Sequence, residues 1–172
     1  MTEEERAALD LSSWEVAYCG AEPVREATFL GFCDAFEPRG FRRSAFYPCY
    51  GLAEATLFVT GSERGASPRC CSVRASALER GEVVLAQDGA DRRTLVSCGK
   101  PYASEEVRIV DPDTRVSLGP DRVGEIWVRG PGLASGYWGR GDEATFGAQL
   151  ADGGEGSFLR TGDLGFLHDD EL

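Results

Sequence analysis

The residues best suited to chemistry lie in three short segments marked by glycine: YCGAEP at 18–23, YGLAEAT at 50–56 and RTGDL at 160–164. The second segment combines an aromatic ring, Tyr50, with a glycine, Gly51, that lets the backbone approach a ligand. A carboxylate, Glu54, follows about one helical turn later. Such a cluster suits a planar ring stacked on Tyr50 and a divalent metal ion near Glu54.

The third segment predicts a turn that presents a carboxylate. Gly162 is expected to turn the chain between two apolar strand residues and to present Asp163, whose two oxygens could bind both hydroxyls of a ribose. Each segment also has an ordinary structural interpretation, with Tyr50 as a core aromatic, Glu54 as a solvated carboxylate at a helix start and Gly162 in a plain hairpin. Taken one at a time, the segments favour the ordinary interpretation.

Two strand-turn-helix units are expected to position the first two segments. WEVAYCGAEP predicts a short buried strand, and VREATFLGFCDAF has apolar residues at helical spacing. A second strand in FRRSAFYPCYG is expected to lead through a loop into a helix over LAEATLFV. Repetition of this unit indicates α/β architecture with a parallel sheet.

The chain beyond Pro101 predicts a β-rich part. EVRIVDPDT, VGEIWVRGP and SFLRTGDLGFLHDDEL alternate apolar and polar residues between turn-rich stretches, which favours an antiparallel sheet or a small distorted barrel. GRGDEATFGAQL predicts a helix with Asp142 as its N-cap. The expected divisions are an incomplete α/β subdomain at 1–61, an insertion at 62–98 and a β-barrel-like subdomain at 99–172, which stops inside its last hairpin.

Composition argues against several classes of function. The 172 residues are 42% hydrophobic and 27% charged, as in a soluble globular protein, and no apolar run approaches the roughly 20 residues of a membrane span. A net charge of -11 disfavours nucleic acid and anionic membranes as partners. Six cysteines without a C-x-x-C pair, and the single histidine His168, argue against structural zinc. The acidic N-terminus has no secretory signal, so a cytoplasmic location is expected.

Together, the ordered segments resemble the adenylate-forming superfamily and, within it, the fatty acyl-AMP ligases. The stretches that carry the resemblance cover nearly all of the chain: AYCGAEPV, FYPCYGLAEATLFVTG, VSCGKP, VRIVDPDT, VGEIWVRGP and FLRTGDLGFL. The resemblance implies that the chain is an internal part of the large N-terminal domain of such an enzyme. The parent enzyme would convert a fatty acid and ATP to acyl-AMP and diphosphate.

The resemblance also implies one site for ATP or AMP and Mg²⁺. The nucleotide would be bound by Gly20, Ala21, Glu22, Tyr50, Gly51 and Asp163. Among these, Tyr50 would stack on the adenine and Asp163 would hold the ribose hydroxyls. Glu54 would be the catalytic residue and metal ligand, because adenylation must bring a carboxylate and a phosphate together against their repulsion.

The chain departs from the wider superfamily in ways that bear on activity. Ala53 replaces the usual threonine before Glu54, and the stretch from about 62 to 97 stands where fatty acyl-AMP ligases carry an insertion. By resemblance, that insertion favours transfer of the acyl group to the thiol of an acyl carrier protein or of a polyketide synthase carrier domain. No phosphate loop precedes Gly20, and Lys100 lies in the wrong motif to replace the catalytic lysine of a C-terminal domain. The chain alone is therefore expected to be inactive.

Two other functions remain open. The parent could be an acyl-CoA synthetase or an assembly-line adenylation domain, which coenzyme A turnover would help to distinguish. The chain could instead be a non-catalytic nucleotide-binding module. Four aromatic residues that could line an acyl tunnel, Phe46, Tyr47, Phe58 and Trp138, are interpreted as core residues.

Overall fold

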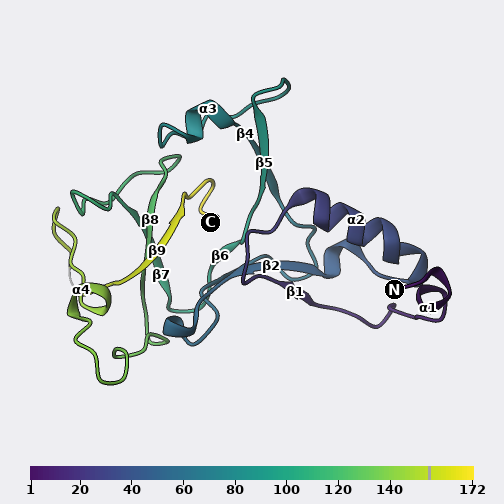
Figure 1. Ribbon diagram of the computed structural model, residues 1–172, viewed down its shortest axis with the longest axis horizontal. Coiled ribbons are helices and arrows are strands. Elements are labelled where there is room, and N and C mark those ends of the chain that lie inside the picture. Colours follow the sequence, from purple (N-terminus) through teal and green to yellow (C-terminus); the bar gives the residue numbers. More distant parts are fainter. Residues whose placement is uncertain (155) are drawn as a thin grey trace.

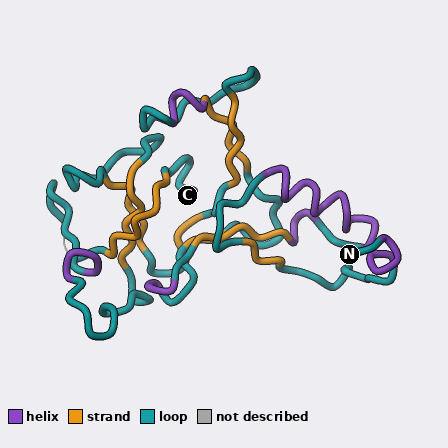
Figure 2. The backbone as a smooth tube through the Cα atoms, viewed as in Figure 1, coloured by secondary structure: helices purple, strands orange, loops and turns teal. Residues whose placement is uncertain are grey.

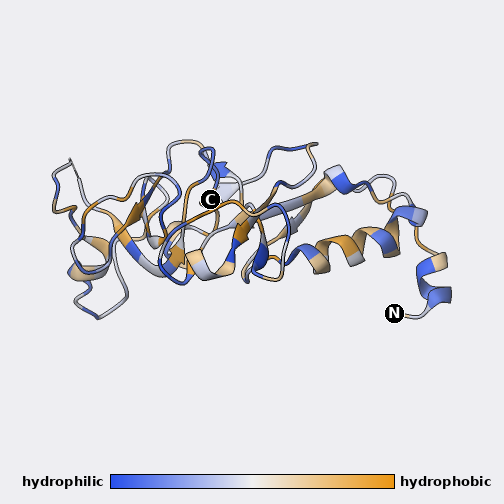
Figure 3. Ribbon diagram, turned by 90° about the horizontal axis from the view of Figure 1, so that it is seen from above, coloured by the Kyte–Doolittle hydropathy of each residue, from blue (hydrophilic) through white to orange (hydrophobic). Residues whose placement is uncertain are grey.

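A computed structural model of the chain describes residues 1–154 and 156–172. The molecule is elongated, with its longest helix and the N-terminus at one end and a β-rich part at the other (Figures 1 and 3). A two-stranded ribbon projects from the middle (Figure 2). In the described part of the chain, no helix is both long enough and apolar enough to cross a bilayer.

Three sheets organise the described residues, with strand orders β1-β2-β3-β6, β4-β5 and β7-β8-β9. The strands are β1 (Ala17–Cys19), β2 (Phe46–Tyr50), β3 (Thr60–Gly61), β4 (Cys70–Arg74), β5 (Arg92–Val96), β6 (Lys100–Pro101), β7 (Glu106–Val110), β8 (Gly124–Arg129) and β9 (Leu159–Gly165). The α-helices are α1 (Glu3–Ala7), α2 (Glu26–Phe36), α3 (Ala75–Leu78) and α4 (Glu143–Phe146). Single 3-10 turns occupy Glu37–Arg39, Arg43–Ala45 and Ala53–Ala55.

The first sheet confirms the predicted strand-turn-helix unit. β1 and β2 are parallel, with Ala17 opposite Phe46, and α2 joins them as the crossover helix. Phe29 and Cys33 of α2 are buried in one core cluster with Phe46, and the Phe29 and Phe46 rings lie 4.7 Å apart. The prediction of a parallel sheet is wrong beyond this pair, because β3 and β6 join in antiparallel fashion and make the sheet mixed.

The predicted helix over LAEATLFV is wrong. The segment makes a single 3-10 turn at Ala53–Ala55, and Leu57 then adopts a left-handed backbone with φ of 81°. The cause is a close contact, because a Cβ added to Gly51 would lie 1.6 Å from the Leu57 carbonyl oxygen. The chain turns back here so that β3 can pair with β2. Backbone pairing between neighbouring strands therefore overrides the local helical pattern.

The segment 62–98 contains a regular two-stranded ribbon. β4 and β5 pair in antiparallel register from Cys70 opposite Val96 to Arg74 opposite Arg92. α3 follows β4 directly, so residues 70–78 form two consecutive short elements. Val73 of β4 is fully buried. The assignment of this segment as a family-specific insertion stays a prediction.

The β-rich part is an open antiparallel sheet with β8 in the middle. The β-rich prediction is confirmed, but the predicted barrel is wrong because the order β7-β8-β9 does not close on itself. Ile126 and Val128 of β8 are buried in one cluster with Ala55 and Val59 from the first half of the chain. The two halves of the molecule therefore share a core.

The helix predicted over GRGDEATFGAQL is present but short. α4 spans Glu143–Phe146, and Asp142 occupies its N-cap position. The side chain of Asp142 makes no capping hydrogen bond and instead accepts the Tyr137 backbone N–H at 3.0 Å. Asp142 therefore ties down the loop before α4 and does not act as the predicted cap.

Candidate functional site

Two of the three glycine-marked segments meet where the halves of the molecule join. Tyr50 ends β2 and Asp163 lies on β9, and the Tyr50 hydroxyl donates a hydrogen bond of 2.8 Å to Asp163 Oδ2. Burial and the neighbouring Asp163 carboxylate raise the pKa of Tyr50 well above its ordinary value, although the Thr161 hydroxyl opposes them. Tyr50 therefore remains a hydrogen-bond donor at neutral pH.

Tyr50 and Asp163 line a cleft of about 860 Å³, within the range of about 300–1,000 Å³ typical of small-molecule sites. Ala21, Glu22 and Gly51 line the same cleft. Its other wall comes from the β4-β5 ribbon and the last residues of the chain, including Cys70, Leu95, Cys98, His168 and Glu171. The structure thus brings five of the predicted nucleotide-binding residues to one cleft.

The remaining predicted nucleotide residue, Gly20, does not line the cleft. A Cβ added to Gly20 would lie 2.8 Å from the Cys49 carbonyl oxygen, so this glycine allows β1 and β2 to approach. Gly51 lines the cleft, but a glycine is required there because the Leu57 backbone, and not a ligand, lies against it. Ala21 has φ of 66°, a left-handed backbone that is unusual for a residue with a side chain.

Glu54 lies outside the cleft lining. Its carboxylate accepts a hydrogen bond from the Tyr137 hydroxyl, and its backbone carbonyl accepts the Ala134 N–H at 2.7 Å. The hydrogen bond from Tyr137, together with the backbone amide of Glu54 itself, holds the pKa of Glu54 below its ordinary value. The carboxylate is therefore ionised at neutral pH and partly exposed.

A magnesium ion at Glu54 would need ligands beyond this chain's carboxylates. Among the described residues, no group of three His, Cys, Asp or Glu side chains is placed to hold a metal ion. Mg²⁺ commonly binds one or two protein carboxylates and completes its shell with water and substrate phosphate oxygens. A single ionised, accessible Glu54 fits that mode of binding and does not fit a closed protein cage.

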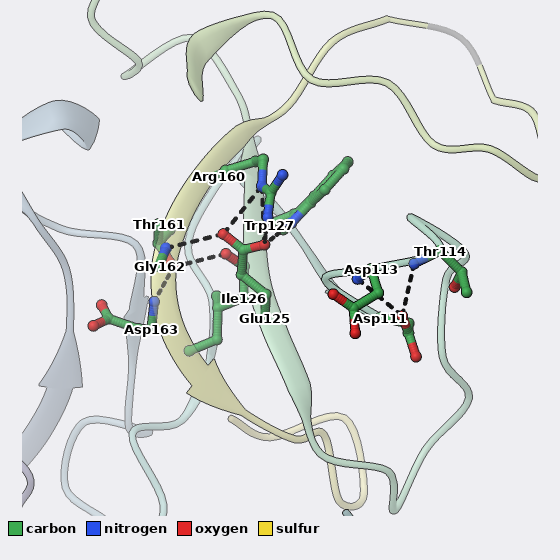
Figure 4. Close-up of polar contacts among 10 residues, drawn as sticks. All are labelled: Asp111, Asp113, Thr114, Glu125, Ile126, Trp127, Arg160, Thr161, Gly162 and Asp163. Atoms are coloured by element: carbon green, nitrogen blue, oxygen red, sulfur yellow. Dashed lines mark hydrogen bonds and ion pairs between the residues drawn. The ribbon is translucent and has the colours of Figure 1, made fainter. Parts of the chain in front are cut away.

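Asp163 is presented by a β-bulge, and the predicted hairpin turn is wrong. β9 continues through Gly162, and residues 161–163 stand opposite Ile126 of β8 (Figure 4). Gly162 has φ of 76°, which glycine adopts without the steric penalty of a Cβ. The bulge interrupts the alternation of the strand, and the Asp163 side chain contacts Tyr50.

Sequence reasoning missed Tyr137 and Glu125, although Glu125 lies in VGEIWVRGP, one of the stretches that carry the resemblance. Tyr137 bonds Glu54 from a loop 83 residues further along the chain, a partnership that no local pattern signals. Glu125 did leave a signal, since a carboxylate inside the apolar run of β8 has to be paired when it is buried.

The four aromatic residues considered for an acyl tunnel differ in burial. Phe46 is buried, which confirms its interpretation as a core residue, and Trp138 is fully exposed, which contradicts that interpretation. Tyr47 and Phe58 are half-buried and belong to a row of rings on the mixed sheet together with Tyr18 and Tyr102. Tyr18 and Tyr102 are themselves exposed.

Comparison with known proteins defines the class. The family model described as AMP-binding enzyme matches residues 1–138, and the chain belongs to this family. A medium-chain-fatty-acid acyl-carrier-protein ligase, JamA of Moorena producens, is 52% identical over 99% of this chain and 30% of that protein. A 4-hydroxyphenylalkanoate adenylyltransferase of Mycobacterium marinum is 43% identical over 99% of this chain and 28% of that protein.

Solved structures show the same relationship. The fatty acid AMP ligase of Legionella pneumophila matches 100% of this chain and 30% of its own length, with 46% identity and a TM-score of 0.93. A structure of the fatty acyl-adenylate ligase of L. pneumophila with acyl adenylate and pyrophosphate gives 46% identity and a TM-score of 0.94. The match confirms the predicted fold class, α/β followed by β-rich. The chain spans about 30% of the length of these relatives.

Proposed function

We propose that this chain forms part of a fatty acyl-AMP ligase, which joins a fatty acid to ATP to give acyl-AMP and diphosphate. The observation that carries the proposal is the hydrogen-bonded pair of Tyr50 and Asp163 in the cleft. The pair occurs in a member of the AMP-binding enzyme family. The structure of a protein that is 46% identical to this chain contains acyl adenylate and pyrophosphate. A cytoplasmic location belongs to the same proposal.

Tyr50 and Asp163 act together on the nucleoside. Asp163 Oδ2 accepts the Tyr50 hydroxyl, and Oδ1 has no hydrogen-bond partner among the described residues, so acceptor sites remain for the ribose hydroxyls. The hydrogen bond also limits rotation of the Tyr50 ring, and an adenine stacked on that ring leaves its ribose beside Asp163. Ala21 and Glu22 line the cleft along the adenine.

Glu54 serves the phosphate end of the substrate. Mg²⁺, when bound, supplies positive charge that offsets repulsion between the phosphates and the fatty-acid carboxylate. Glu54 would hold the ion, because its carboxylate is ionised and partly exposed. The Tyr137 hydroxyl orients Glu54 and supplies no positive charge of its own.

Transfer to a carrier-protein thiol is the second half of the proposed reaction. Two relatives, 52% and 40% identical, are named as ligases of medium-chain fatty acids to acyl carrier protein. Acyl-CoA formation is the alternative, because a relative that is 41% identical is named as a putative fatty-acid–CoA ligase. We assign the segment 62–98 as the insertion that favours the carrier, which can be a polyketide synthase carrier domain.

Nucleotide binding is tested on the 172-residue chain by titration calorimetry with AMP. Asp163→Asn removes the charge that receives the ribose hydroxyls, and hydrogen bonds to charged groups contribute about 1.5–3 kcal/mol. AMP affinity is expected to fall at least about tenfold. Asp113→Asn, an exposed aspartate on the same half of the molecule, is the matched control and should bind AMP like the original chain. If Asp163→Asn and Asp113→Asn bind AMP with equal affinity, Asp163 is not part of the AMP-binding site.

The acceptor is tested on the natural gene product with a fatty acid and ATP. Release of diphosphate that depends on fatty acid supports adenylation. Acylation of a carrier-protein thiol without acylation of coenzyme A supports the proposed ligase, and the reverse result supports the synthetase. Nucleotide binding without any diphosphate release would favour the non-catalytic module.

A further inference from the structure

Glu125 is a buried carboxylate whose partners are all hydrogen-bond donors. It lies on β8 with 5% of its surface exposed. Its Oε2 accepts the Trp127 indole N–H at 2.9 Å and forms an ion pair of 2.7 Å with the Arg160 guanidinium. Its Oε1 accepts the backbone N–H of Gly162 at 3.1 Å (Figure 4).

These contacts keep Glu125 charged inside the sheet. Burial opposes ionisation, but hydrogen bonds from Arg160, Trp127 and the Gly162 amide outweigh it and hold the pKa of Glu125 below its ordinary value. A buried charge persists when each of its oxygens is satisfied in this way. Two of the partners fix the carboxylate within the sheet, and the third is the backbone of the bulge.

The bulge has a second anchor on the other side of Gly162. The Thr161 hydroxyl donates to the Ile126 carbonyl at 2.7 Å and accepts the Asp163 backbone N–H at 3.1 Å. The Glu125 contact and the Thr161 contact thus fix the peptide groups immediately before the Asp163 side chain (Figure 4). Glycine at 162 has no side chain to resist displacement, so these hydrogen bonds define its place.

We infer that Glu125 is a positioning residue, which holds the bulge so that Asp163 meets the ribose of the nucleotide. The inference rests on the proposed function of Asp163. Glu125 lies outside the cleft lining and acts through the Gly162 amide. Its contribution is preorganisation, since the carboxylate of Asp163 is already placed before the nucleotide arrives.

An amide cannot replace this carboxylate, although it has the same shape. In Glu125→Gln one acceptor oxygen becomes an NH₂ donor, while every partner of Glu125 is itself a donor. The remaining oxygen satisfies the shorter contacts to Arg160 and Trp127, and the NH₂ group then faces the Gly162 N–H. Because two N–H donors cannot form a hydrogen bond with each other, the Gly162 backbone, and with it the bulge, is expected to move away.

The test compares AMP with 2′,3′-dideoxy-AMP by titration calorimetry on the 172-residue chain. The original chain is expected to prefer AMP by at least about tenfold, because the ribose hydroxyls donate to a charged acceptor. In Glu125→Gln the preference is expected to fall to less than about threefold, with AMP losing affinity and the dideoxy analogue nearly unaffected. A general loss of structure would weaken both ligands alike.

Glu106→Gln is the matched control. Glu106 is a partly buried carboxylate on the neighbouring strand β7 that also pairs with an arginine, Arg129, but it does not contact the bulge. This variant should retain the preference for AMP. If Glu125→Gln also retains it, the positioning role is refuted. If the original chain binds AMP without any preference over the dideoxy analogue, the proposed role of Asp163 fails and the inference fails with it.

Two further measurements keep the outcomes separate. Amide hydrogen exchange without nucleotide should be faster at Gly162 in Glu125→Gln by at least about tenfold, because the amide has lost its acceptor. If the exchange rate of the Gly162 amide is unchanged, Glu125 does not hold the bulge through this amide, whatever the variant's affinity for AMP. If Arg160, left without a charged partner, unfolds the single variant, combining Glu125→Gln with Arg160→Met removes the partly buried cation. The same loss of ribose preference is then expected relative to Arg160→Met alone.

Discussion

The hydrogen bond between Tyr50 and Asp163 gives the most direct quantitative test of the site. Tyr50→Phe keeps the ring and removes only the hydroxyl that donates to Asp163 Oδ2 at 2.8 Å. A hydrogen bond to a charged group contributes about 1.5–3 kcal/mol. Asp163 is exposed and water can replace the lost donor, so we expect a coupling free energy of about 1 kcal/mol between the two side chains.

The coupling is measured with a double-mutant cycle of Tyr50→Phe and Asp163→Ala. Urea unfolding followed by tryptophan fluorescence gives the free energy of unfolding of each variant. The cycle removes effects that each change has alone. Repeating it with Asp113→Ala in place of Asp163→Ala should give no coupling. A coupling energy below about 0.3 kcal/mol at Asp163, within the usual scatter of independent sites, would show that the pair does not form.

Two other changes test the surroundings of the site. Tyr137→Phe removes the hydrogen bond that lowers the pKa of Glu54, so the pKa should rise when the carboxyl carbon is titrated by NMR, and an unchanged value would contradict the contact. Since a lowered carboxyl pKa stabilises the fold above the unfolded pKa and is lost on acidification, this variant should also lose less stability as pH falls. Gly51→Ala places a Cβ 1.6 Å from a backbone oxygen and should destabilise the chain by more than about 3 kcal/mol, whereas Gly31→Ala in α2 meets nothing within 4 Å and should be neutral or stabilising in the same unfolding assay.

The parts of the fold that could be predicted are those set by local pattern. The apolar run that ends at Cys19 and the helical spacing from Val24 to Phe36 identified β1 and α2, because burial of one face needs little more than periodicity. The pairing of β3 with β2 was not predictable in this way. The helical pattern over 52–59 gives way to a contact between Gly51 and Leu57, which depends on backbone geometry.

The candidate site shows the same division. Tyr50 and Asp163 were singled out by residue type and glycine context, and the family resemblance assigned them to one site. Their side chains meet although 113 residues separate them. Gly162 was assigned to a turn because glycine at a positive φ suits both turns and bulges, and only pairing with β8 decides between them. Glu125 was not assigned a role, since its importance depends on which backbone amide it meets.

The core shared between the halves gives the site a mechanical character. Tyr50 is carried by the mixed sheet and Asp163 by the open sheet, and the two sheets are held together by Ala55 and Val59 against Ile126. The two sheets can pivot about this buried contact, and Tyr50 and Asp163 lie on different sheets. A small tilt of one sheet relative to the other would separate the Tyr50 ring from the Asp163 carboxylate, so the apolar packing between the sheets controls the width of the proposed nucleoside site.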